Sequence, residues 1–152
     1  EKKVVKPLKL LYQYFLYNMT IIYSPKNNPR IIIIQKLYEK YYNKDKNFTF
    51  PKHRFKKFIK DVVYGTLERN ELIEDEIKNH LKDDIKINNL DKVFQVIIKC
   101  AIFELLYKPK TSINVIIKEY LIASNFFITD PQTKYLNAIL DKISKKIRIP
   151  NE

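Results

Sequence analysis

The amino-acid sequence predicts an all-α protein. Its apolar residues recur at steps of three and four, the spacing that places them on one face of a helix. The 152 residues include a single glycine, Gly65, so the tight two-residue turns of β-hairpins lack their usual residue. Asparagine, aspartate and proline mark the stretches between the apolar segments. We therefore expect helices joined by polar loops.

The first two helices are predicted at Val4–Thr20 and at about Pro29 to Tyr42. Asn28 followed by Pro29 is typical of a helix start, with a capping side chain and then a proline in the first turn. The isoleucine run 31–34 also suits a β-strand, but a lone strand has no partner, so a helix is expected. The candidate core residues of the second helix are Ile32, Ile33, Leu37 and Tyr41.

A third, long helix is predicted from about Lys52 to Leu81. Its apolar stripe begins at Phe55 and continues without a break past Gly65. Because glycine inside a helix costs about 1 kcal/mol relative to alanine, we expect another helix to approach closely there, with a kink as the alternative.

Three further helices are predicted in the C-terminal half. They are capped by Asn89, by Ser112 and by Thr129 or Asp130, and they run to about Tyr107, Phe127 and Ile147. We expect one domain over 1–152 with two packed subdomains, about 1–81 with three helices and 82–152 with three or four.

The composition argues against several classes of function. One glycine cannot build a phosphate-binding Walker loop or a dinucleotide-binding fingerprint. The single cysteine, Cys100, lies in an apolar run and is expected to be a small buried hydrophobe. With His53 and His80 it gives too few ligands for a zinc site. We expect no metal and no cofactor.

No apolar stretch approaches the roughly 20 residues that a membrane-spanning helix needs, and no signal-peptide pattern is present at the start. A cytoplasmic protein without membrane contact is therefore expected. The net charge of +12 suggests an anionic partner, although the lysine bias would also follow from an AT-rich genome. The distribution is more informative, because residues 1–50 hold ten basic and three acidic residues.

Five segments, in order and at the right spacing, resemble the NusB family. The stretch 98–107 is similar to its pattern of apolar-Arg-apolar-Ala-apolar-Tyr-Glu-Leu. The stretch 115–120 is similar to its Val-Ile-Asn-Glu segment, and 135–142 to its Phe-Val-Asn-Gly-Val-Leu-Asp-Lys signature. Leu11-Tyr12 resembles the Leu-Tyr of the first helix, and 58–65 resembles a third-helix segment ending in glycine.

The resemblance covers about Val4 to Arg148 and departs from the family at several positions. Lys118 stands where asparagine is usual, and Ala138 where glycine is usual. The arginine-rich N-terminal stretch of the family is replaced here by lysines, which lack the planar, two-point geometry of a guanidinium.

The resemblance implies a function as well as an all-helical fold. NusB proteins are transcription antitermination factors, not enzymes, and they pair with the ribosomal protein NusE. They bind boxA-type single-stranded RNA of ribosomal RNA leaders and help the RNA polymerase elongation complex to resist termination. A similar domain precedes the catalytic part of a ribosomal-RNA cytosine methyltransferase, so a fragment of such an enzyme is one alternative. A structural adaptor without RNA affinity is another, and salt-dependent RNA binding would distinguish it.

The resemblance also implies where RNA and protein bind. Lys2, Lys3 and Lys6 are expected to attract phosphates, unless they are a frayed, solvated end. Tyr12 is an RNA candidate that also fits the core. Phe127, Lys134 and Tyr135 surround the connection between the last two helices, where the rings stack bases or pack in the core. The protein-partner candidates are Phe94 and Glu104.

Two charged clusters are expected to be solvated faces. The basic residues Lys52, Arg54, Lys56, Lys57 and Lys60 lie around one helix start. The acidic residues Glu71, Glu74, Asp75 and Glu76 would alternatively dock a basic ribosomal protein.

Overall fold

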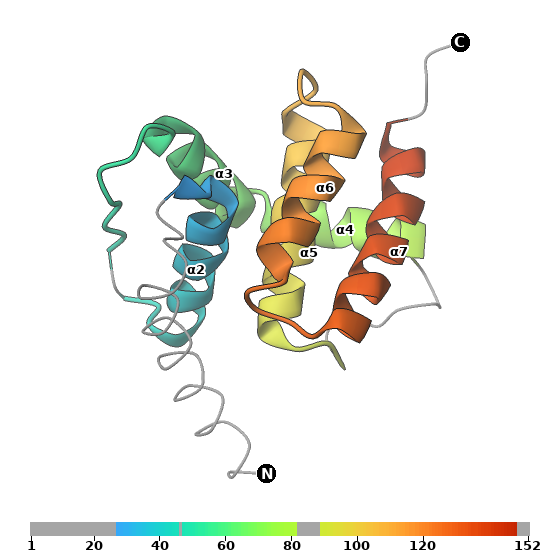
Figure 1. Ribbon diagram of the computed structural model, residues 1–152, viewed down its shortest axis with the longest axis horizontal. Coiled ribbons are helices and arrows are strands. Elements are labelled where there is room, and N and C mark those ends of the chain that lie inside the picture. The colour runs from blue at the N-terminus through green and yellow to red at the C-terminus, as the bar shows by residue number, and fades with distance from the viewer. Residues whose placement is uncertain (1–26, 46, 82–88, 149–152) are drawn as a thin grey trace, which may run out of the picture.

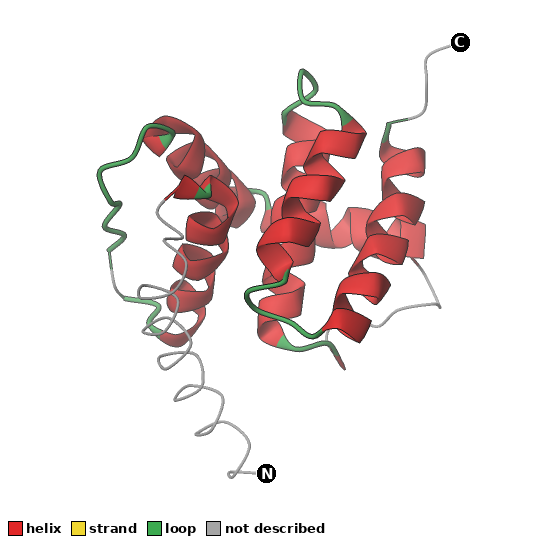
Figure 2. Cartoon of the chain, in the orientation of Figure 1, coloured by secondary structure: helices red, strands yellow, loops and turns green. Residues whose placement is uncertain are grey.

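The computed structural model describes residues 27–45, 47–81 and 89–148. These residues form helices and no strand (Figure 2), which confirms the predicted all-α class. The first predicted helix, Val4–Thr20, lies outside the described residues. The helices are α2 (Pro29–Tyr42), α3 (Lys56–Glu68), α4 (Asn70–Leu81), α5 (Lys92–Tyr107), α6 (Ile113–Ser124) and α7 (Asp130–Ile147).

Helix α5 is the centre of the fold and contacts each of the other five described helices. In Figure 1, α2 and α3 lie to the left of α5, α6 lies in front of it, and α4 and α7 lie to its right. A helix surrounded in this way must be apolar nearly all round. The sequence of α5 meets that demand, because ten of its sixteen residues are buried.

Helix α2 begins and ends where the sequence predicts. The Asn28 side-chain oxygen accepts hydrogen bonds from the backbone N–H groups of Arg30 and Ile31, at 3.0 and 3.3 Å. Pro29 occupies the first turn, where its missing N–H costs nothing. All four isoleucines of the run 31–34 are buried, so the run lies in the core as part of a helix.

The prediction of one helix from Lys52 to Leu81 is wrong. The helix starts at Lys56 and is interrupted at Arg69, where φ is −106° and ψ is 21°. The guanidinium of Arg69 lies 4.2 Å from the centre of the Tyr107 ring on α5. The apolar stripe continues through the bend because α3 and α4 both pack on α5. Since α4 also packs on α7, it lies with α5, α6 and α7 in a four-helix group.

Gly65 lies where another helix approaches closely, as the sequence predicts. The Phe103 ring of α5 occupies the space that a Cβ atom at position 65 would need. The close contact therefore offsets the helix-forming cost of glycine, and the bend occurs at Arg69 instead.

The C-terminal helices follow the predicted capping chemistry in two of three cases. Ser112 caps α6 through the backbone N–H of Val115, and Thr129 with Gln132 forms a reciprocal capping box at the start of α7. Helix α5 instead starts after Asp91, not after Asn89, and no side chain caps it. Helix α6 ends at Ser124 rather than Phe127 because the backbone turns back there, with three N–H groups bonding to Ala123 and Ser124.

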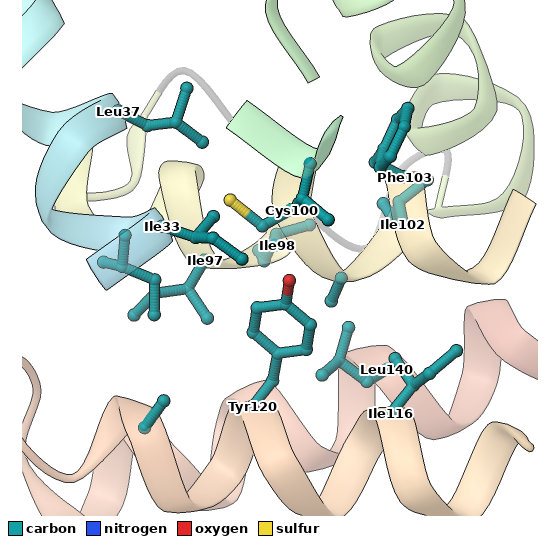
Figure 3. Close-up of a cluster of buried hydrophobic side chains, with 14 of the residues drawn as sticks. Ile33, Leu37, Ile97, Ile98, Cys100, Ile102, Phe103, Ile116, Tyr120 and Leu140 are labelled. Carbon is teal, nitrogen blue, oxygen red and sulfur yellow. The ribbon is translucent and has the colours of Figure 1, made fainter. Parts of the chain in front are cut away.

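The core lies between α5 and its neighbours. Figure 3 shows Tyr120 of α6 pointing toward the helix that carries Ile98 and Cys100. Cys100 is fully buried, which confirms its predicted role, and burial raises the pKa of its thiol. Within the described ranges, none of the helices combines the length and apolar character that crossing a bilayer requires.

Candidate nucleic-acid interface

A pocket of about 840 Å³ lies at one end of the molecule. It opens where the last turn of α2, the start of α5 and the α6–α7 connection meet, at the bottom of Figure 1. Helix α2 and its following residues supply Tyr38, Tyr41, Tyr42 and Lys44. The other walls are Leu90, Asp91, Lys92 and Val93 on one side and Phe127, Ile128, Thr129 and Gln132 on the other.

Three tyrosines form the α2 side of this pocket. Residues 38, 41 and 42 are spaced three and four apart, so their side chains share one side of the helix. The ring of Tyr42 lies edge-on to the rings of Tyr38 and Tyr41, with 5.0 Å between centroids in each case. Tyr41 is 45% exposed, so its assignment to the core was wrong. The last turn of α2 extends past the core and leaves this ring at the surface.

The hydroxyl groups of Tyr38 and Tyr42 lie 2.9 Å apart and share a hydrogen bond. Burial, followed by this hydrogen bond, raises the pKa of Tyr38 well above that of free tyrosine. The Tyr38 phenol is therefore neutral near neutral pH. A neutral phenol both donates and accepts hydrogen bonds, which suits the edges of a nucleobase.

Two lysines place positive charge at the pocket. The Lys92 ammonium nitrogen lies 4.8 Å from the centre of the Tyr41 ring. Lys44 is exposed and lines the α2 side of the pocket, as Tyr41 does. The carboxylate of Asp91 accepts a hydrogen bond from the Gln132 amide at 3.4 Å. Aromatic rings beside cations are the combination that holds a stacked base together with its phosphate.

The α6–α7 connection brings Phe127 to the same pocket. The backbone N–H of Phe127 bonds to the Ser124 carbonyl at 2.9 Å, and its half-buried ring lines the pocket. The Thr129–Gln132 capping box fixes the start of α7 immediately afterwards. The predicted candidate Phe127 therefore lines the same pocket as the three tyrosines of α2.

Lys134 and Tyr135 do not line the pocket, and they follow its lining residue Gln132 by two and three positions. Both are exposed and belong to the first two turns of α7. The Tyr135 ring stacks on Phe94 at 5.8 Å and 27°, yet Tyr135 stays 42% exposed. A ring supported in this way is available for further stacking without being part of the core.

Phe94 and Glu104, the expected protein-partner residues, are both buried at 2% and 0% exposure. The Phe94 ring stacks against the ring of Tyr135. Glu104 forms a two-point ion pair with Arg30 inside the core. Direct contact of either side chain with a partner protein does not fit this arrangement, because both are enclosed by neighbouring helices.

Four other expected residues, Lys2, Lys3, Lys6 and Tyr12, lie outside the described residues. Conversely, the tyrosines at the end of α2 were not predicted as site residues. Their spacing was visible in the sequence as Tyr-Glu-Lys-Tyr-Tyr. What the sequence did not reveal was that α2 ends beside the start of α5, because that contact depends on tertiary packing.

Comparison with known proteins identifies one family by its sequence model and by individual relatives. The model of the NusB family matches residues 15–145. A transcription antitermination protein NusB of Allorhizobium ampelinum is 30% identical over 93 residues, covering 61% of this chain and 58% of that protein. One of Sinorhizobium fredii is 31% identical over 91 residues, covering 60% and 57%. The chain thus spans just under three fifths of the length of these curated relatives.

A solved structure described as T. maritima NusB is similar in fold. It aligns with a TM-score of 0.69 and 23% sequence identity, and the alignment covers 81% of this chain and 92% of that one. At this identity the likeness supports the helical architecture.

Proposed function

The chain belongs to the NusB family, and from this membership we propose that it is a transcription antitermination factor. In this proposal it pairs with NusE and binds boxA-type single-stranded RNA of ribosomal RNA leaders. The assembly then helps the RNA polymerase elongation complex in the cytoplasm to resist termination. The chain contributes binding surfaces and no catalysis.

The observation that carries the RNA proposal is the aromatic pocket beside α2. Helical side chains cannot read the deep, narrow groove of duplex RNA, so sequence choice requires unpaired bases. Unpaired bases stack on aromatic rings and make hydrogen bonds through their edges. The pocket offers three tyrosines, Phe127 and two lysines, and the exposed Tyr135 follows the pocket residue Gln132 by three positions on α7.

We propose that this pocket, the N-terminal lysines and NusE form one composite RNA site. Attraction between lysines and phosphates is independent of sequence and weakens strongly with salt. Specific, tight binding therefore needs the aromatic contacts and the partner protein together. NusE is expected to be required for high affinity.

Affinity measurements with single-site variants test the pocket. Phe127→Ala and Tyr41→Ala should each weaken binding of a boxA-like RNA in the presence of NusE by about 1–3 kcal/mol. Leu72→Ala is a matched control, because Leu72 is 53% exposed on α4 and does not line the pocket. Normal affinity of both pocket variants, with folding verified by circular dichroism, would contradict the proposal.

The N-terminal lysines are tested through salt dependence. Replacing Lys2, Lys3 and Lys6 with glutamine should weaken all RNAs about equally. It should also reduce the slope of log affinity against log salt by about 0.7 for each phosphate that the variant no longer neutralises. An unchanged slope would mean that these lysines do not contact the RNA.

A further inference from the structure

A second cluster of rings and cations lies on the face formed by α3 and the segment before it. We call it the lysine–aromatic ridge and define it as Lys40, Phe48, Phe50, Lys60 and Tyr64. The three ring centroids lie 5.6, 5.7 and 5.8 Å apart. Every ring therefore contacts the other two, and Tyr64 is 42% exposed.

A lysine lies at each end of the ridge. The Lys40 ammonium nitrogen is 5.5 Å from the centre of the Phe48 ring. The Lys60 ammonium nitrogen is 5.6 Å from the centre of the Phe50 ring. The five residues thus form a continuous series of cation, rings and cation across two helices and the segment between them.

Helix periodicity adds further positive charge beside the ridge. Lys56 and Lys57 lie four and three residues before Lys60, and Tyr64 lies four residues after it. All of these side chains are exposed and share the solvent side of α3, opposite its buried residues. The basic run predicted to be a solvated face is indeed exposed, and two of its five members, Arg54 and Lys60, lie over aromatic rings.

The ridge also connects to the candidate pocket. A second pocket of about 390 Å³ lies between α2 and the α3–α4 junction, and Lys40 is one of its lining residues. Tyr41 and Lys44 line both this pocket and the larger one. Rings and cations therefore continue from the candidate RNA pocket, past the end of α2, to the ridge.

We propose that the ridge is a second contact surface for the same single-stranded RNA, so that a strand leaving the pocket continues across α3. This inference rests on the proposed RNA-binding function. The chemistry favours RNA over an acidic peptide because three mutually contacting rings with a lysine at each end offer base stacking together with phosphate attraction. Successive bases stack on aromatic rings while lysines attract the phosphates between them.

Two RNAs of different length distinguish contact with the pocket from contact with the ridge. We compare a boxA-like oligonucleotide of about 6 nucleotides with one of about 16, which spans the usual range of single-strand sites. Tyr64→Ala should weaken binding of the longer RNA by between about 5-fold and 150-fold and leave the shorter one unchanged. Lys57→Gln/Lys60→Gln, at two exposed positions, should lower the salt slope for the longer RNA by about 1.4.

The matched control is Lys78→Gln/Lys145→Gln, which removes the same charge from exposed positions on α4 and α7. It should leave the length dependence intact. If both ridge variants bind the longer RNA as tightly as the wild type, the ridge inference is overturned. If Phe127→Ala still binds RNA more weakly in that case, the pocket proposal stands. If Phe127→Ala binds normally while the ridge variants are impaired, the ridge inference stands and the pocket proposal fails.

Discussion

Arg30 at the start of α2 and Glu104 near the end of α5 form a two-point ion pair inside the protein. The guanidinium Nε and Nη2 atoms lie 3.0 and 2.7 Å from the two carboxylate oxygens. The guanidinium carbon lies 5.2 and 5.5 Å from the centres of the Phe58 and Tyr120 rings. Burial opposes the charge on Arg30, but the hydrogen bond and charge of Glu104 outweigh it and raise the arginine pKa.

Removing one member of this pair should be more harmful than removing both. Arg30→Met leaves a fully buried carboxylate without its partner and should lower the free energy of unfolding by about 3–5 kcal/mol. Arg30→Met/Glu104→Leu should recover much of that loss, because no buried charge remains. Urea denaturation of the wild type, both single variants and the double variant measures the coupling. Additive single effects would contradict this account.

A side chain at position 65 should collide with Phe103. Gly65→Ala is expected to destabilise the protein by about 1–3 kcal/mol through overpacking, even though alanine is the better helix former. Phe103→Leu should be less damaging in the Gly65→Ala background than in the wild type, since it removes the colliding ring. The measurement is thermal or urea unfolding. A Gly65→Ala protein as stable as the wild type would show that the ring moves aside without cost.

Tyr135 should contribute to RNA binding rather than to folding. Because it is 42% exposed and its ring contact is with Phe94, Tyr135→Ala should leave the fold intact. It should lose about 1–3 kcal/mol of boxA-like RNA affinity when NusE is present. Tyr135→Phe keeps the ring and serves as the control, with near-normal affinity expected. A large fall in melting temperature would instead assign Tyr135 to the core.

Part of the stability should depend on pH through Glu74. The hydrogen bond from Lys99, at 2.9 Å, is the main cause that lowers the Glu74 pKa below its ordinary value of 4.5. A lowered folded-state pKa means that this stabilisation is present above about pH 4.5 and is lost as the pH falls below it. Glu74→Gln should therefore lose less stability than the wild type between pH 7 and pH 3.

Glu71→Gln, an exposed change on the same helix, is the control for this comparison. Its loss of stability on acidification should match that of the wild type. If Glu74→Gln behaves like Glu71→Gln, the Lys99 contact has no part in the acid response.

Capping residues in the sequence predicted where helices start better than the apolar pattern predicted where a helix is interrupted. Asn28–Pro29 and Thr129–Pro131 mark helix starts because capping depends on a few neighbouring residues. The break at Arg69 carries neither proline nor glycine, and the seven-residue step from Thr66 to Ile73 keeps the apolar stripe intact. Its position depends on α5, where Arg69 lies over Tyr107, and sequence periodicity does not record that contact.

The residues of the candidate site could also be predicted from the sequence only in part. Phe127 and Tyr135 were predicted from the family resemblance. Phe127 lines the pocket, and Tyr135 is exposed on α7. The tyrosines of α2 were missed because their apolar rings at helical spacing also fit a core. Phe94 and Glu104 were predicted as protein-partner residues, and the structure encloses both by packing that involves residues distant in sequence.

The central position of α5 has a consequence for how the protein opens. Neither α2 with α3 nor α4, α6 and α7 can detach from α5 without exposing apolar sides of α5 to water. Sub-global opening is therefore costly, and the amides of α5 should exchange with deuterium only through global unfolding. Amide protons near Cys100 and Ile102 are expected to have the largest protection factors in the chain. Their exchange free energy should equal that from denaturant unfolding, whereas amides of the α6–α7 connection should exchange through small local fluctuations.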